Sequence, residues 1–172
     1  MFNIETVKTT AQEATNKLIT EIKANGFDRD YVAEFKDGVE FKVYIQREQI
    51  NCALSCESLR KWLDSFFKAG GDQMNAFESE FFSAVYDFAQ EHPLFTDIEH
   101  IHTQMWIIDE VDQHSPNAVF YAYAEAPTDY ETPDYESLEK VMNAAYGLLV
   151  LSHTWLDAKR NAVVSGQPLV VS

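Results

Sequence analysis

Histidine and carboxylate side chains, which bind divalent metal ions, gather in one segment of the chain. The group comprises Asp97, Glu99, His100, His102, Asp109, Asp112 and His114. On a strand, His100 and His102 point to the same face, a spacing that metal sites use. Asp97 and Glu99 then face the other way, and no further histidine pair completes a metal motif. We therefore interpret the group as a solvated strand end, and a metal-dependent enzyme using His100 and His102 is our third hypothesis.

The two cysteines are the other candidates for chemistry. Cys52 and Cys56 form a single Cys-x-x-x-Cys pair, and the missing second pair argues against zinc. The alternation of Ile50, Cys52 and Leu54 indicates that Cys52 is a small core residue on a strand. A nucleophilic cysteine needs a basic neighbour such as His153, and the sequence cannot place one beside it. We predict no catalytic residue, no metal and no cofactor, and hence a protein that is not an enzyme.

Charge is segregated along the chain. No lysine or arginine occurs between Ala69 and Glu139, a stretch of 71 of the 172 residues that carries 16 Asp and Glu. The remaining residues hold 12 acids and 13 bases, so the formal charge of −15 is −16 from this stretch and +1 from the rest. At average usage, about eight basic residues would occur in a stretch of this length. We call residues 69–139 the acidic segment.

The acidic segment is rich in aromatic residues, which disordered acidic tails lack. They include Phe77, Phe81, Phe82, Tyr86, Phe88, Trp106, Phe120, Tyr121 and Tyr123. We therefore expect the segment to fold and to hold its carboxylates on a defined surface. Such a surface disfavours direct binding of nucleic acid or of an anionic membrane, because both require cations on the contact face.

Length and composition favour one domain spanning residues 1–172. The first residues, Met1 to Glu5, show no basic region followed by an apolar run, so we expect no signal peptide. The longest apolar stretch, near Gly147 to Leu151, is too short to span a bilayer. Two closely spaced cysteines without an export signal are typical of reduced thiols, so we expect a cytoplasmic protein.

In the first part of the chain, apolar spacing predicts a helix and a hairpin. An apolar stripe predicts a helix over 4–25, which Gly26 ends. Alternating residues on both sides of Asp37-Gly38 predict a β-hairpin. We prefer a three-residue loop that pairs Phe35 with Val39 and places Gly38 in the left-handed conformation. A short third strand is expected over 50–54.

The second part predicts three helices and two strands. Two helices carry the apolar residues from Leu59 to Phe67 and from Met74 to Phe88, and two strands cover about 101–110 and 118–126. Thr132 is expected to cap a long final helix. That helix is apolar around most of its circumference, so either the sheet and other helices or a second copy of the chain must cover it. The fold class is therefore α+β, an antiparallel sheet of four to five strands with helices packed on one face, in the order α-β-β-(β)-α-α-β-β-α.

A tyrosine pair leaves two alternatives open. Tyr121 and Tyr123 share one face of the last strand, opposite Phe120, Ala122 and Ala124. The tyrosine face is either a half-exposed contact patch for a protein or is covered by another helix.

Our leading hypothesis is a non-enzymatic binding protein whose carboxylates occupy a basic, nucleic-acid-binding surface of a partner protein. Duplex DNA carries about one charge per 1.7 Å of axis, and a folded acidic surface can imitate it. Inhibitors of defence systems or nucleases, and immunity-type proteins, act in this way. The expected partner-binding residues are Glu80, Asp87, Glu91, Asp109, Glu110, Asp112, Asp129, Glu131, Asp134 and Glu136.

The alternative hypothesis rests on a resemblance in element order, size and acidity. Helix, three strands, helical segment, two strands and helix is similar to the class I type III secretion chaperones. The resemblance implies a homodimer that holds an unfolded segment of another protein, with the apolar final helix as its seam. The additional helix around Phe77 to Phe88 departs from that pattern, and no residue motif carries over.

Overall fold

The fold is α+β, as the sequence predicts. The computed structural model describes residues 2–46, 49–69, 72–96, 103–107, 115–125 and 131–164. The elements are α1 (Ile4–Asn25), β1 (Asp30–Glu34), the turn η1 (Lys36–Gly38), β2 (Val39–Gln46), β3 (Gln49–Cys56), α2 (Glu57–Ala69), α3 (Asp72–Ala89), α4 (Pro93–Thr96), β4 (Thr103–Ile107), β5 (Ala118–Glu125) and α5 (Tyr135–Val164). The predicted order is confirmed, and α4 is a short addition to it.

The five strands form one antiparallel sheet in the order β1-β2-β3-β5-β4. The hairpin prediction is confirmed, because Ala33 pairs with Phe41 and the Phe35 N–H donates to the Val39 carbonyl at 2.8 Å. Gly38 has φ +72° and Asp37 has φ +63°, so both adopt the left-handed conformation that glycine and aspartate tolerate best. The turn thus keeps the apolar residues of β1 and β2 on one face.

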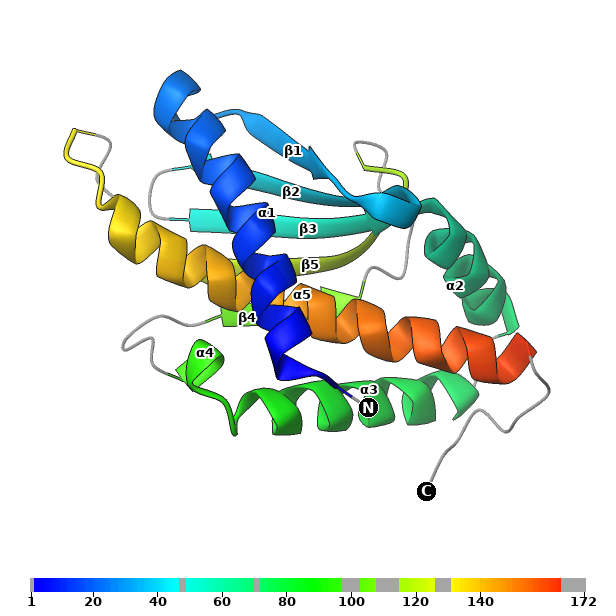
Figure 1. Cartoon of the computed structure of the whole chain (residues 1–172). Coiled ribbons are helices and arrows are strands. Elements are labelled where there is room, and N and C mark those ends of the chain that lie inside the picture. Colours follow the sequence, from blue (N-terminus) through cyan, green and yellow to red (C-terminus); the bar gives the residue numbers. More distant parts are fainter. Residues whose placement is uncertain are drawn as a thin grey trace.

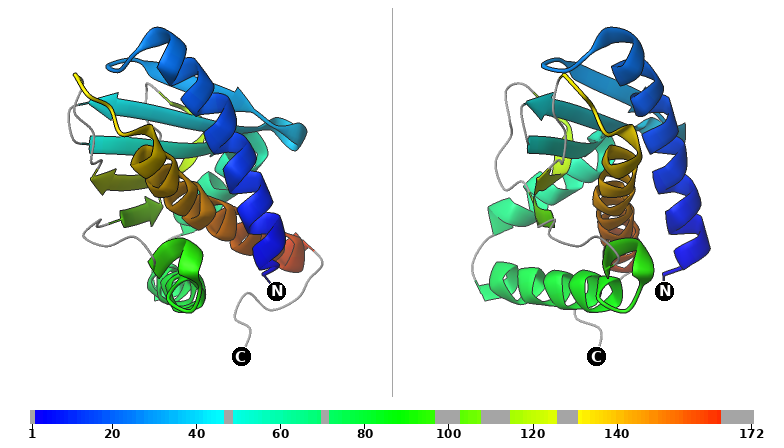
Figure 2. Two further views of the ribbon diagram at one scale, coloured as in Figure 1. Left: turned by 60° about the vertical axis from the view of Figure 1, so that its left-hand side comes forward. Right: turned by 90° about the vertical axis from the view of Figure 1, so that its left-hand side faces the viewer.

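Two helices, α1 and α5, lie side by side on one face of the sheet (Figures 1 and 2). The predicted stripe of α1 is buried along its whole length, at Val7, Ala11, Ala14, Leu18 and Ile22. Alternate residues of the inner strands are buried beneath the helices, at Phe41, Val43, Ile45, Ile50, Cys52 and Leu54. Burial of these apolar faces against one another is the main source of the fold's stability.

The apolar circumference of α5 is covered within one chain. Every residue from Ala144 to Ser152 is buried, and α5 contacts the sheet together with α1, α3 and α4. Gly147 permits the approach of α4, because a Cβ atom there would lie 2.8 Å from a ring carbon of Phe95. Of the two covers that the sequence leaves open, the structure shows the sheet and other helices of the same chain.

The predicted cap of α5 is wrong by two residues. The helix begins at Tyr135, and its cap is Asp134 rather than Thr132. The Asp134 side chain accepts from the Ser137 N–H at 3.1 Å and from the Ser137 hydroxyl at 2.7 Å. These hydrogen bonds satisfy an N–H of the first turn that no helix carbonyl can reach.

The sheet face opposite α1 and α5 is half-covered. Tyr121 and Tyr123 are half-buried, and Val32 on the same face is 40% exposed. The tyrosine pair therefore lies between the fully exposed and fully covered alternatives.

Candidate functional site

Most of the exposed carboxylates of the acidic segment lie toward one end of the molecule. The C-terminal end of α3, the end of β5 and the start of α5 all point to the left in Figure 1. The exposed residues there are Asp87, Glu91, Glu125, Glu131, Asp134 and Glu136. We call these six residues the acidic end. Five of them belong to the predicted partner-binding set, and Glu125 was not predicted.

Four predicted binding residues, Asp109, Glu110, Asp112 and Asp129, lie outside the described residues. The same holds for the metal candidates, which include His100 and His102. Among the residues that the structure describes, no group of three or more His, Cys, Asp or Glu side chains is placed to hold a metal ion.

Glu80 is engaged inside the molecule rather than presented to solvent with Asp87 and Glu91. Its carboxylate lies 2.9 Å from the ammonium of Lys159, whose side chain is only 7% exposed. This ion pair joins α3 to α5. The acidic ridge expected on α3 is therefore shorter, and consists of the exposed Asp87 and Glu91 near the end of the helix.

The acidic end also contains fixed positive features that reduce its field. The ammonium of Lys23 lies 5.1 Å from the centroid of the Tyr135 ring, and Lys140 is exposed on the second turn of α5. Hydrogen bonds from Ser137 hold the pKa of Asp134 below its usual value, so this carboxylate stays charged at neutral pH. The six carboxylates still outnumber these two cations.

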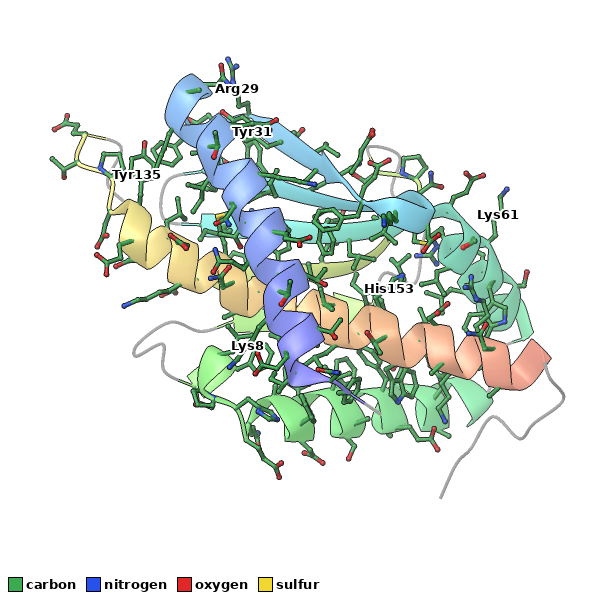
Figure 3. All side chains as sticks on the ribbon, in the orientation of Figure 1. Lys8, Arg29, Tyr31, Lys61, Tyr135 and His153 are labelled. Atoms are coloured by element: carbon green, nitrogen blue, oxygen red, sulfur yellow. The ribbon has the colours of Figure 1, made fainter. Side chains whose placement is uncertain are left out.

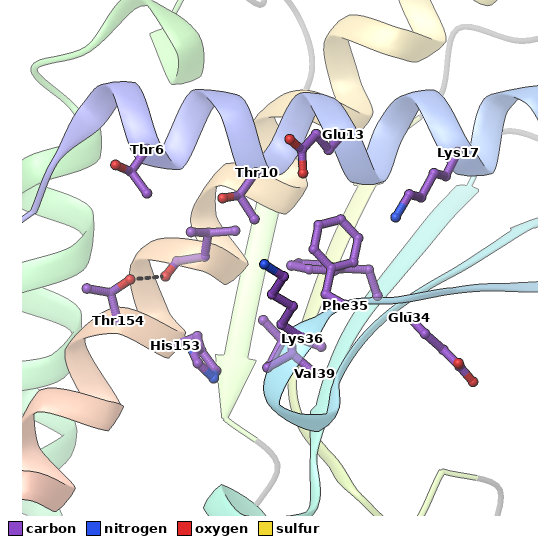
Figure 4. A pocket seen from close by; sticks show the side chains of 13 residues that line it. Thr6, Thr10, Glu13, Lys17, Glu34, Phe35, Lys36, Val39, His153 and Thr154 are labelled. Carbon is purple, nitrogen blue, oxygen red and sulfur yellow. Dashed lines mark hydrogen bonds between the residues drawn. The ribbon is translucent and has the colours of Figure 1, made fainter.

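A separate concave site lies between α1, η1 and α5 (Figure 4). Its volume is about 830 Å³. Its floor is apolar and its rim is polar, a combination found in small-molecule sites. The lining residues are Thr6, Thr10, Glu13, Lys17, Glu34, Phe35, Lys36, Val39, Phe41, Leu54, Val150, His153 and Thr154.

His153 of this pocket is hydrogen-bonded to Cys56, the last residue of β3. The Cys56 sulfur also accepts from the backbone N–H of Leu59, so the cysteine occupies the N-cap position of α2. The Ser58 hydroxyl lies 3.5 Å from the same sulfur and itself accepts from the Arg160 guanidinium at 3.0 Å. Because the Arg160 bond occupies a lone pair, the Ser58 proton is directed to the sulfur.

The hydrogen bond from His153 is the largest effect that lowers the pKa of Cys56, which falls to about 7. Burial opposes it, and the Leu59 N–H and Ser58 support it. Cys52 behaves oppositely, since full burial raises its pKa to about 12 despite a hydrogen bond with Tyr146. Cys52 is thus the core residue that the sequence predicts, and Cys56 is the thiol with chemical potential.

Sequence reasoning named His153 as the required base but examined Cys52 as the thiol. Two signals point to Cys56 instead. It directly precedes the first residue of a predicted helix, where backbone N–H groups favour a thiolate. His153 and Arg160 are also seven residues apart and therefore share one face of the final helix.

Comparison of the chain with models of protein families, with curated proteins and with solved structures gives no significant match. Within the described ranges, no helix has both the length and the apolar character needed to cross a membrane.

Proposed function

We propose that this protein is a non-enzymatic binding protein whose acidic end docks on a basic, nucleic-acid-binding surface of a partner protein. The observation that supports the proposal is the gathering of six exposed carboxylates at one end of a folded molecule. All six come from a stretch that contains no lysine or arginine.

The physical basis is electrostatic complementarity. Carboxylates held by helices and a strand attract a basic surface without the entropic cost of ordering a tail. The attraction accelerates encounter and weakens as salt shortens the range of the field. The partner is therefore a nuclease or another nucleic-acid-binding protein of a defence or toxin system, and the protein acts on it as an inhibitor or immunity-type factor.

Two further features enter this proposal. Both cysteines are free, which supports a reducing, cytoplasmic setting. The apolar surface of α5, which suggested the seam of a chaperone dimer, is covered by α1, α3, α4 and the sheet of the same chain. The binding hypothesis therefore ranks above the chaperone alternative.

The proposal predicts a salt-sensitive complex. Immobilised protein should capture its partner from a host extract at about 0.05 M NaCl and release it near 0.5 M, where the Debye length falls to a few ångströms. Duplex DNA or RNA should displace the same partner, because both ligands compete for one basic surface. A partner that remains bound at high salt and in the presence of excess nucleic acid would contradict the proposal.

A further inference from the structure

Cys56 lies in the wall of the pocket between α1, η1 and α5. Val39, Phe41 and Leu54 line that pocket, and Val39 is the cross-strand partner of Cys56. Paired residues of antiparallel strands have Cα atoms about 4.5–5.5 Å apart. His153 also lines the pocket and is hydrogen-bonded to the Cys56 sulfur. The thiol is therefore one residue from the pocket, although Cys56 itself is only 4% exposed.

The surroundings of the sulfur stabilise its ionised form. Hydrogen-bond donors reach it from the imidazole of His153, from the Leu59 N–H and from Ser58. These groups come from α5 and from the first turn of α2, whose N-terminus carries partial positive charge. A thiolate held in this way reacts as a nucleophile, because the ionised sulfur rather than the thiol attacks electrophiles.

The pocket rim carries charges of both signs. Lys36 extends from η1 toward α1, and the ammonium of Lys17 lies 4.4 Å from the centroid of the Phe35 ring (Figure 4). Glu13 projects from α1 on the same rim. Two ammonium groups and a carboxylate fit a ligand that itself carries carboxylate and ammonium groups, and the apolar floor accommodates its uncharged part.

We propose that Cys56 is a thiol-exchange site for a low-molecular-weight disulfide bearing carboxylate and ammonium groups, bound in the pocket between α1, η1 and α5. The Cys56 proton passes to His153. The thiolate then attacks one sulfur of the ligand, a new protein–ligand S–S bond forms, and the ligand's own S–S bond breaks. The departing thiolate takes the proton from His153, so one thiol and one disulfide are converted into one mixed disulfide and one free thiol.

The mixed disulfide persists until an external thiol reduces it. Cys52 and Cys56 are four residues apart on one strand, which separates their Cα atoms by about 13 Å at about 3.3 Å per residue. A disulfide requires a Cα separation below about 7 Å, so Cys52 cannot resolve the adduct. The site therefore functions as a modification site and adds a redox input to a binding protein.

The test uses the full-length protein and oxidised glutathione, with modification followed by intact mass and by peptide mapping. We expect one adduct, on Cys56, formed with a rate that rises with a midpoint near pH 7. His153→Gln should move the midpoint toward the ordinary thiol value and slow the reaction at pH 7 about three- to fivefold, because the smaller thiolate fraction is partly offset by higher nucleophilicity. A midpoint that His153→Gln leaves unchanged would overturn the role of His153.

The ligand class is tested with Lys36→Ala and with the uncharged 2-hydroxyethyl disulfide. Lys36→Ala should slow modification by oxidised glutathione several-fold and leave the rate with the uncharged disulfide unchanged. Equal losses with both disulfides, or none with either, would overturn the assignment of the pocket. Cys56 that reacts only after unfolding, as we expect of Cys52, would overturn the site itself, and the wild-type protein alone gives that result.

Discussion

Replacing Phe81 with alanine should lower the free energy of unfolding by about 3–5 kcal/mol, the usual cost of removing a buried phenylalanine ring. Phe81 is fully buried on α3. Its ring stacks on Phe120 of β5 at 5.5 Å and meets Trp155 of α5 edge-on at 5.2 Å. One side chain thus joins three elements. In a chain of this size the loss corresponds to roughly 10 °C in thermal midpoint.

Phe82 supplies the matched control for this prediction. It is the next residue of α3 and also contacts the Phe81 ring, but it is only half-buried. Phe82→Ala should therefore cost about 1–2 kcal/mol, in proportion to the apolar area it removes from water. Denaturant unfolding of both variants measures the difference. Equal losses would show that α3 is not anchored by Phe81, and the position of Asp87 and Glu91 would lose its structural basis.

Glu80→Ala should destabilise the protein by about 3 kcal/mol, because it removes the carboxylate that faces a nearly buried ammonium. Lys159 is 7% exposed and Glu80 is 25% exposed, so the lysine has less access to water than its partner. The Lys159 ammonium also lies 5.3 Å from the centroid of the Trp155 ring, a contact that does not replace a carboxylate. Lys159→Met should cost less, since Glu80 can be hydrated.

The double variant Glu80→Gln, Lys159→Met distinguishes an ion pair from ordinary packing. It removes both charges and keeps most of the volume, so much of the stability lost in Glu80→Ala should return. Unfolding in urea gives the four free energies of the cycle. Additive losses in the cycle would contradict the assignment of Glu80 to an ion pair and would return it to the solvent-facing ridge.

Local sequence signals predict much of this fold because they are strong where the elements are regular. The stripe of α1 repeats every three or four residues over its whole length, and its bounds agree with the structure. The hairpin follows from alternation plus Asp37-Gly38, since one loop length keeps the apolar faces together. The cap of α5 was misassigned because Thr132 and Asp134 both suit an N-cap, and only the contacts of Ser137 distinguish them.

The site residues required information that no local pattern contains. Glu80 looks exposed on a helical wheel, and the distant Lys159 determines its role. Likewise, Cys56 and His153 come from opposite ends of the chain and meet only because α5 crosses the end of β3 near the start of α2. The acidic end was partly predictable, because charge segregation is a property of composition and the ends of α3 and α5 follow from their periodicity.

The central claim is that the acidic end, rather than net charge, binds the partner. Its most direct test compares two variants that remove three charges each, Asp87→Asn, Glu91→Gln, Glu136→Gln at the acidic end and Glu5→Gln, Asp37→Asn, Glu57→Gln elsewhere on the exposed surface. The measurement is affinity for the captured partner at low and high salt. At about 0.5 kcal/mol per exposed charge, the first variant should bind about tenfold more weakly at low salt, with little difference near 0.5 M NaCl, whereas the second should bind like the wild type. Equal losses in both variants would show that only net charge matters and would contradict the account.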